Sequence, residues 1–86
     1  MTNKQYTEKE VPQVNDIYEH FKGHGKLYRV LEVARDAENP DQARVVYEQL
    51  YESEFPKGEV WSRTLEDFVG YKQVGGRKVK RFTLID

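Results

Sequence analysis

The chain has 86 residues, enough for one small domain and too few for two independent hydrophobic cores. Apolar residues make up 37% and charged residues 34%, so the core is small and must draw on six Tyr, four Phe and one Trp. The absence of cysteine excludes a disulfide framework, a thiolate zinc site and cysteine-based catalysis.

The N-terminal segment is polar. Residues 1–13 show no apolar periodicity and contain Pro12, which predicts a flexible tail. The segment lacks the apolar core of a secretory signal, and no stretch approaches the roughly 18 apolar residues of a spanning helix. We expect a single domain over residues 14–86, in the cytoplasm and without a membrane association.

The first strands are predicted at Ile17–Phe21 and Leu27–Arg35. Leu27–Arg35 is rich in apolar and branched residues and lies between Gly25 and a polar loop. Ile17–Phe21 is less distinctive, because the apolar residues from Val14 to Phe21 also fit the spacing of a helix.

The segment Arg44–Tyr51 fits two structures. Its β-branched and aromatic residues are typical of a strand. The apolar residues from Ala43 to Tyr51 also fall on one helical face, and Asn39-Pro40 resembles a helix start. Periodicity alone favours the helix, although a helix of eight residues has little stability of its own.

The C-terminal half reads as strands with one short helical turn. Glu59–Thr64 alternates in the manner of a strand, and Thr64 is a suitable N-cap for a turn ending at Phe68. Gly75-Gly76 predicts a hairpin turn that leads into a strand over Lys78–Ile85.

The charge is uneven along the chain, although the net charge is only −1. Residues 68–85 contain no acidic residue and five basic ones, namely Lys72, Arg77, Lys78, Lys80 and Arg81. This distribution indicates a local positive patch on a mildly acidic body. An ordinary solvated hairpin that happens to be basic would have the same composition.

An ordered set of residues resembles a small bacterial family, catalogued as domain of unknown function 1653. The matching positions span about Tyr18 to Phe82: Tyr18-x-His20-Phe21-Lys22-Gly23, Tyr28-x-Val30, Ala34-Arg35, Glu38, Val45-Val46-Tyr47, Leu50-Tyr51, Trp61-x-Arg63, Phe68 and Arg81-Phe82. The resemblance implies a mainly β fold: a small SH3-like barrel of five antiparallel strands with a short helical turn. It therefore favours a strand at Arg44–Tyr51.

The resemblance implies no chemistry, and the chain departs from the family at two places. Thr64 follows Arg63 where the family usually has proline, which would fix φ and remove a donor. Glu19 stands where the family tends to have arginine, so an anion-binding role for that arginine is not implied here.

The residues do not assemble a catalytic or metal-binding motif. His20 and His24 lie four apart, but Gly23 and Gly25 argue against the helix that this spacing would need, and no third ligand is indicated. The serines lie outside any nucleophile elbow. We expect no enzymatic activity, no metal and no cofactor.

The aromatic and basic residues are instead interleaved, as a binding surface requires. The candidate ligand-binding residues are Tyr18, His20, Lys22, Tyr28, Arg35, Tyr47, Tyr51, Trp61 and Arg63. Of Tyr28, Tyr47, Tyr51 and Trp61, we expect at least half to pack in the core, with hydroxyls that reach solvent or a backbone partner. Trp61 or Val46 should be central to the core if it is buried.

The leading hypothesis is a monomeric, non-catalytic adaptor that recognises a peptide or protein partner through this aromatic and basic surface. The alternative is weak binding of RNA or DNA by the C-terminal hairpin, with Lys78, Lys80 and Arg81 as the phosphate contacts. A pI near 6.1 is low for a dedicated nucleic-acid binder.

Overall fold

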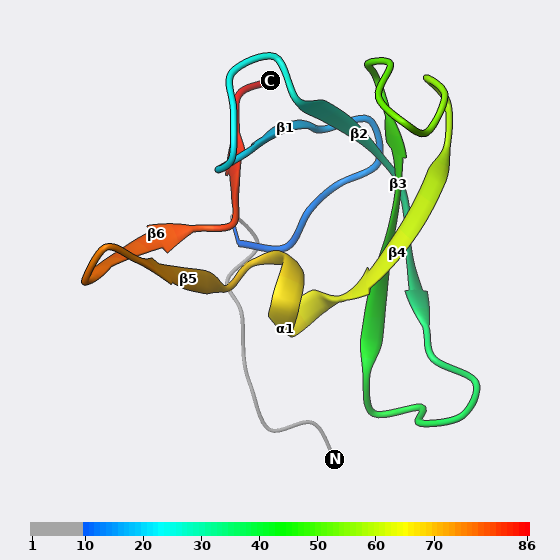
Figure 1. Ribbon diagram of the computed structural model, residues 1–86. Coiled ribbons are helices and arrows are strands. Elements are labelled where there is room, and N and C mark those ends of the chain that lie inside the picture. The colour runs from blue at the N-terminus through cyan, green and yellow to red at the C-terminus, as the bar shows by residue number, and fades with distance from the viewer. Residues whose placement is uncertain (1–9) are drawn as a thin grey trace.

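The computed structural model describes residues 10–86, which form a mainly β domain with one short helix (Figure 1). In chain order the elements are β1 (Ile17–His20), β2 (Leu27–Arg35), β3 (Ala43–Gln49), β4 (Val60–Thr64), α1 (Leu65–Phe68), β5 (Tyr71–Val74), β6 (Arg77–Lys80) and β7 (Phe82–Leu84). The predicted mainly β class is confirmed.

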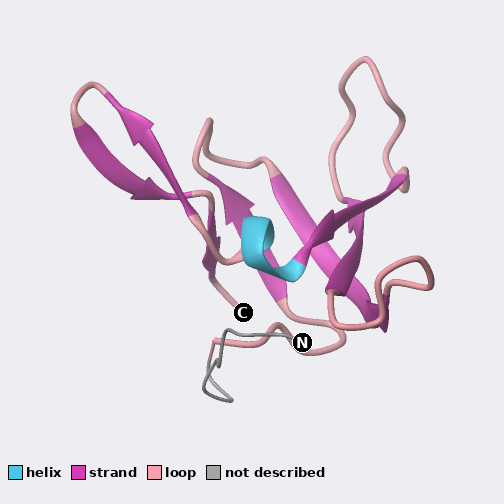
Figure 2. Ribbon diagram, turned by 90° about the horizontal axis from the view of Figure 1, so that it is seen from below, coloured by secondary structure: helices cyan, strands magenta, loops and turns pink. Residues whose placement is uncertain are grey.

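The strands form two antiparallel sheets. One sheet has five strands in the order β4-β3-β2-β1-β7, and the other is the β5–β6 hairpin, which projects from it (Figures 1 and 2). The pairing of β4 with β7 that would close a barrel is not seen among residues 10–86. The barrel expected from the resemblance is therefore not confirmed.

The ambiguous segment Arg44–Tyr51 is a strand, not a helix. β3 pairs with β2 on one side and with β4 on the other, so both of its backbone edges are hydrogen-bonded. Alternate residues Val45, Tyr47 and Gln49 are buried. Pairing on both sides outweighs the local helical spacing, which stabilises a short isolated helix very little.

The predicted strand Lys78–Ile85 is corrected, because the chain breaks it at Arg81. The Arg81 backbone N–H donates to the Gly70 carbonyl at 3.0 Å, and its carbonyl accepts from the Phe21 N–H at 2.9 Å. The first bond closes the base of the hairpin and the second begins the pairing of β7 with β1. Arg81 thus belongs to neither strand, and it separates the hairpin from the five-stranded sheet.

The two turns expected in this half are confirmed. Gly75 and Gly76 connect β5 to β6 with positive φ angles of 56° and 79°, a conformation that favours glycine. Thr64 caps α1, and its hydroxyl oxygen accepts from the Asp67 N–H at 3.1 Å. The single turn of α1 ends at Phe68, whose side chain is completely buried.

The core lies between the five-stranded sheet and α1. It consists of Tyr18, Val30, Val45, Tyr47, Phe68 and Phe82. The Phe68 and Phe82 rings stack with centroids 4.2 Å apart, and the edge of Tyr18 meets Phe68 at 5.0 Å. Val46 is only half-buried, because Val45 and Tyr47 occupy the inner face of β3.

The structure describes only the end of the predicted tail, which was expected over residues 1–13. Residues 1–9 lie outside the described residues, whereas Pro12 is buried. The Asn15 N–H donates to the Val30 carbonyl at 2.8 Å, which joins the segment before β1 to β2. Within residues 10–86 no helix is long and apolar enough to cross a membrane.

Replacement of Phe82 by alanine should strongly destabilise the folded protein. Removing a buried phenylalanine costs about 3–5 kcal/mol, a large part of the roughly 5–15 kcal/mol that holds a typical domain folded. Urea unfolding followed by near-ultraviolet circular dichroism measures the loss. Val60→Ala is the control, since Val60 is 54% exposed. A Phe82→Ala protein as stable as this control would contradict the assignment of the core.

Candidate functional site

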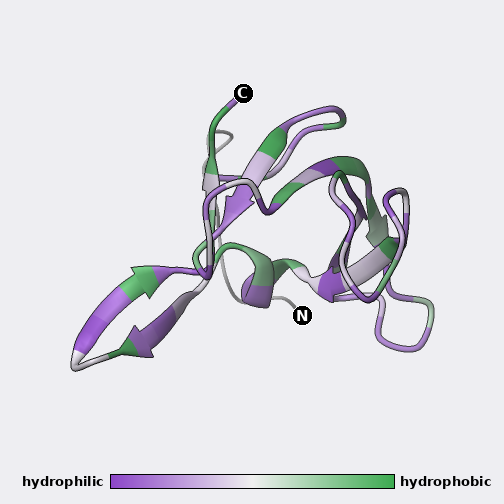
Figure 3. Cartoon of the chain, turned by 45° about the horizontal axis from the view of Figure 1, so that its top comes forward, coloured by the Kyte–Doolittle hydropathy of each residue, from purple (hydrophilic) through white to green (hydrophobic). Residues whose placement is uncertain are grey.

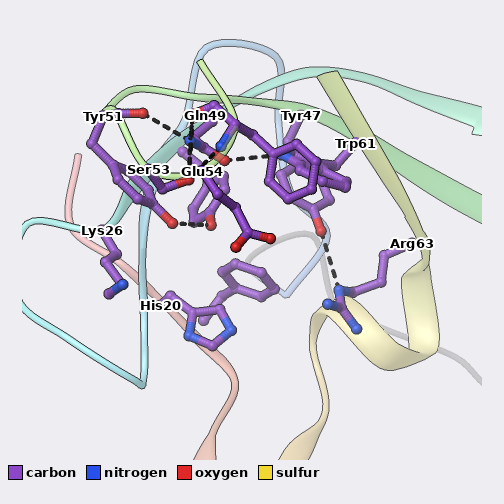
Figure 4. Close-up of a pocket in the computed structure, with 12 residues that line it drawn as sticks. His20, Lys26, Tyr47, Gln49, Tyr51, Ser53, Glu54, Trp61 and Arg63 are labelled. Carbon is purple, nitrogen blue, oxygen red and sulfur yellow. Dashed lines mark hydrogen bonds between the residues drawn. The ribbon is translucent and has the colours of Figure 1, made fainter. Parts of the chain in front are cut away.

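A pocket of about 400 Å³ opens on the side of the sheet where β1 to β4, β7 and the loop after β3 meet (Figure 4). Six aromatic side chains line it, from Tyr28, Tyr47, Tyr51, Phe55, Trp61 and Phe82. Three side chains with basic groups also line it, from His20, Lys26 and Arg63, together with Gln49, Ser53 and Glu54. Rings and cationic groups thus share one cavity.

Tyr28 is at the centre of the aromatic set. Its ring meets those of Tyr47, Tyr51 and Phe82 edge to face, with centroids 5.3, 5.5 and 5.7 Å away. Its hydroxyl lies 2.5 Å from the hydroxyl of Tyr51. Burial and this hydrogen bond raise the pKa of Tyr28, so the hydroxyl remains protonated.

Gln49 organises the wall of the pocket from the end of β3. The side chain is buried because it continues the inner face of β3 after Val45 and Tyr47. Its Nε2 donates to the Tyr51 carbonyl at 2.8 Å, the Ser53 hydroxyl at 3.1 Å and the Phe55 carbonyl at 3.0 Å. One buried amide thereby holds the loop that carries two of the aromatic walls.

Trp61 and Arg63 reach the pocket from alternate positions of β4. The Trp61 indole N–H donates to Gln49 Oε1 at 3.2 Å, and the Arg63 Nε donates to the Tyr47 hydroxyl at 3.1 Å. The Phe55 ring meets Trp61 edge to face at 4.8 Å, so Trp61 is half-buried between loop and sheet. Each side chain is held by the hydrogen bond that it donates to a side chain of β3.

His20 lies at the boundary between the pocket and the core. Its Nδ1 accepts from the Lys22 backbone N–H at 3.0 Å, which places the proton of the neutral ring on Nε2. Burial, followed in decreasing order by the nearby charges of Arg63, Lys22, Arg81 and Lys26, lowers the pKa of His20 to about 4. His20 is therefore neutral at physiological pH.

Lys26 completes the basic side of the pocket. It lies in the loop between β1 and β2, and its ammonium is 5.5 Å from the centre of the Tyr51 ring. The Arg63 guanidinium lies 5.9 Å from the centre of the Phe82 ring. Both cations thus lie over aromatic faces in a pocket whose lining includes one acidic residue, Glu54.

Six of the candidate residues named from the sequence line this pocket: His20, Tyr28, Tyr47, Tyr51, Trp61 and Arg63. Three others lie elsewhere. Tyr18 is a core residue with 6% of its surface exposed, and Lys22 is exposed outside the pocket. Arg35 is at the far end of β2, where its Nη1 donates to the Pro40 carbonyl at 2.9 Å.

Sequence reasoning did not name Lys26, Gln49, Phe55 or Phe82 as parts of this site. The inward alternation of β3 could have identified Gln49, because it places that residue on the same face as Tyr47. Lys26 and Phe55 lie in loops, and nothing in the local sequence indicates where those loops fold.

The candidate phosphate contacts lie on the hairpin, away from the pocket. The ammonium groups of Lys78 and Lys80 are 5.6 and 5.7 Å from the centre of the Tyr71 ring. Cross-strand pairing of Tyr71 with Lys80 and of Gln73 with Lys78 puts these side chains on one face. Arg81 lies outside this face, and its Nε donates to the Asp67 carbonyl at 3.1 Å.

No group of three or more His, Asp or Glu side chains that could hold a metal ion is found among residues 10–86. Of the two histidines, His24 is fully exposed, and its Nδ1 lies 3.6 Å from Glu19 Oε2.

Gln49→Met should loosen the wall of the pocket at nearly constant side-chain volume. The change removes three donated bonds and the acceptor of the Trp61 indole, and each buried polar group left without a partner costs about 1–3 kcal/mol. We expect a lower free energy of unfolding in urea and a change in the emission of Trp61, the sole tryptophan. Unchanged stability and emission would show that the network does not hold the loop.

The stability of the protein should fall as the pH decreases from about 6.5 towards 4. In this range the unfolded chain protonates His20 at the ordinary pKa of about 6.5, whereas the folded chain, with a pKa of about 4, does not. Proton binding therefore favours the unfolded state. Urea unfolding at successive pH values measures this.

In the same measurements, His20→Gln should flatten the decline above about pH 5, where most carboxylates are still ionised. His24→Gln is the matched control and should keep the wild-type dependence, since its ring is exposed. A His20→Gln protein with the wild-type slope would show that another group is responsible.

The family model described as "Protein of unknown function (DUF1653)" matches residues 16–84, from the residue before β1 to the end of β7. Searches of curated proteins and of solved structures found no match to this chain. The family match covers all the strands and all the described aromatic residues, and it agrees with the resemblance in the sequence. The chain therefore belongs to the DUF1653 family.

Proposed function

We propose that this chain is a non-catalytic binding module whose pocket recognises a short segment of a peptide or protein partner. The observation that carries the proposal is the gathering of six aromatic rings and the cations of Lys26 and Arg63 around one cavity of about 400 Å³ (Figure 4). This volume lies in the usual range of ligand pockets and suits one or two side chains. Aromatic and arginine side chains dominate binding energy at protein interfaces.

The polar groups of the pocket support a binding role over a catalytic one. The Ser53 hydroxyl accepts from Gln49 Nε2 and from the Phe55 N–H, both at 3.1 Å, and donates to the Phe55 carbonyl at 3.3 Å. His20 uses Nδ1 to accept from the Lys22 N–H. A nucleophile needs a base within hydrogen-bond reach, whereas these groups hold the walls in place.

The strand order supports an SH3-type architecture as the finer description of the fold. β1 to β4 follow one another as antiparallel neighbours, a short helix follows β4, and the last strand returns beside β1. In our proposal this is an SH3-type barrel that is open between β4 and β7, with Phe68 of α1 filling the gap. Domains of this type bind extended peptides in aromatic grooves.

Selection of a displayed peptide library against the full chain tests the proposal. We expect enriched peptides whose binding, measured by fluorescence polarisation, is lost or strongly weakened by Lys26→Glu. Lys72→Glu is the matched control, because it makes the same charge change on the hairpin. Amide shifts caused by a selected peptide should map to the pocket. Selection that yields no binder, or shifts confined to another surface, would overturn the proposal.

A second candidate function rests on the exposed face of the β5–β6 hairpin. Figure 3 shows hydrophilic stretches over much of this hairpin, and Tyr71, 57% exposed, lies beside the ammonium groups of Lys78 and Lys80. Stacking on an aromatic ring with neighbouring phosphate contacts is the way in which single-stranded nucleic acids are bound without sequence preference. The proposed partner is therefore a single-stranded RNA or DNA, bound weakly.

Titration of a labelled single-stranded RNA at several salt concentrations tests this second role. Two phosphate contacts predict a slope of about −1.4 for log K against log salt. The double variant Lys78→Glu/Lys80→Glu should abolish binding, and Lys57→Glu, which lies outside the hairpin, should reduce it much less. Absence of binding at low salt, or equal effects of both variants, would remove nucleic acid as a partner.

A further inference from the structure

We propose that the pocket binds the anionic group of its ligand, a carboxylate or a phosphate, between Arg63 and His20, with Lys26 contributing from the other rim (Figure 4). The inference rests on the proposed binding function and deepens it, because it states which chemical class the pocket selects. An apolar or aromatic part of the ligand then packs on the tyrosine rings.

The hydrogen-bonding groups that face the pocket are mainly donors. Arg63 uses Nε for the Tyr47 hydroxyl, so its Nη1 and Nη2 groups are not needed for that bond and can grip an oxyanion. His20 carries its proton on Nε2, because Nδ1 accepts from the Lys22 N–H. The Tyr28–Tyr51 hydroxyl pair uses one of its two hydrogens within the pair and leaves the other to donate.

Apart from the Glu54 carboxylate, the acceptors of the pocket are already engaged. Gln49 Oε1 accepts from the Trp61 indole, and the Ser53 hydroxyl oxygen accepts from both Gln49 Nε2 and the Phe55 N–H. A ligand rich in donors would find few partners here, whereas a ligand rich in acceptors would find several. The hydrogen-bonding inventory therefore matches an oxyanion.

The charges decide between an anion and a cation. Aromatic pockets also bind quaternary ammonium groups through the faces of their rings. Here two of the six rings already have a cation over them, because the Lys26 ammonium lies 5.5 Å from the centre of the Tyr51 ring and the Arg63 guanidinium 5.9 Å from that of Phe82. An incoming cation would be repelled by the two cations and attracted by one carboxylate, that of Glu54. An anion would be attracted by the two cations and repelled by the one carboxylate.

The surroundings of His20 are also positively charged. The charged groups that act on its ring are Lys22 and Lys26 from the β1–β2 loop, Arg63 from β4 and Arg81 before β7. The Phe21 ring stacks on it at 4.8 Å, Tyr28 and Phe82 lie 6.4 and 5.1 Å away, and Glu54 lines the same pocket. After burial, the charges of Arg63, Lys22, Arg81 and Lys26 disfavour the imidazolium. An anion bound beside the ring offsets these charges and raises its pKa.

Three small probes with the same ring but different charge test the proposal on the full chain: phenyl phosphate, benzoate and benzyltrimethylammonium. We expect both anions, near pH 7, to shift the indole N–H resonance of Trp61, the sole tryptophan, and the amides of residues 51–55. The tighter of the two anions distinguishes a phosphate source from a carboxylate source. Shifts from the ammonium probe alone, or from none of the probes, would overturn the proposal.

Variants of the cations give a second, quantitative test. Arg63→Gln should weaken phenyl phosphate binding about tenfold or more, as expected for the loss of a charge-assisted hydrogen bond. Arg63 also bonds to Tyr47, so its replacement can disturb the fold as well as the site. Lys26→Gln changes a loop residue instead, and it should weaken phenyl phosphate binding severalfold. Arg35→Gln is the matched control. Wild-type affinity in Lys26→Gln and in a folded Arg63→Gln would contradict the site.

The pKa of His20 gives a third test. It should respond to a bound anion, whereas it should not respond if Arg63 and Lys26 only stabilise the fold. Phenyl sulfate, whose charge stays constant, should raise the pKa of His20 by about one unit or more, with the exposed ring of His24 as the control in the same spectra. If peptides bind the pocket but phenyl phosphate, benzoate and phenyl sulfate do not, the anion proposal is refuted and the proposed function still stands. Peptides that map to another surface would refute the proposed function itself.

Discussion

The ring of Phe82 is the element on which both the fold and the pocket depend. One face stacks on Phe68 at 4.2 Å and thereby docks α1 on the sheet. Its other contacts reach into the pocket, where Tyr28 and His20 meet it edge to face and the Arg63 guanidinium lies near it. The last strand, β7, therefore contributes one ring to both the core and the pocket.

In this small domain the pocket and the core share side chains. Tyr47 illustrates this, because its ring belongs to the core and its hydroxyl accepts from Arg63 at the rim of the pocket. Gln49 also belongs to both. Its side chain is buried in the sheet, and its amide holds the loop that bears Phe55. With 86 residues the chain has too few large side chains for the core and the pocket to use separate sets.

The sequence predicted most strands because their residues are branched or aromatic over continuous stretches. β2 was predicted with its observed bounds, Leu27–Arg35, and β3 and β4 within one or two residues. The break at Arg81 could not be predicted, because it depends on bonds to Gly70 and Phe21, which are remote in sequence. The closed barrel expected from the resemblance is the part of the fold that the strand pairing does not confirm.

The candidate site was predictable to the extent that it is aromatic. Tyr28, Tyr51 and Trp61 were named for their chemistry and do line the pocket. Tyr18 was named for the same reason and is a core residue, because residue type does not tell an inward ring from an accessible one. Lys26 could not be predicted, because its position at the cavity depends on the path of its loop. That path is set by tertiary contacts and not by the local sequence.

The separation of the β5–β6 hairpin from the five-stranded sheet affects how the chain tolerates added sequence. Among residues 10–86 both strands pair only with each other, and all of their residues except Val79 are exposed. Local opening of the hairpin therefore exposes almost no apolar surface, so its amides should exchange with solvent well before those of β2 and β3. Residues inserted between Gly75 and Gly76 would lengthen a solvent-facing tip and leave the cavity walls in place. The hairpin tip is thus the natural point at which to graft a label or a second domain onto this fold.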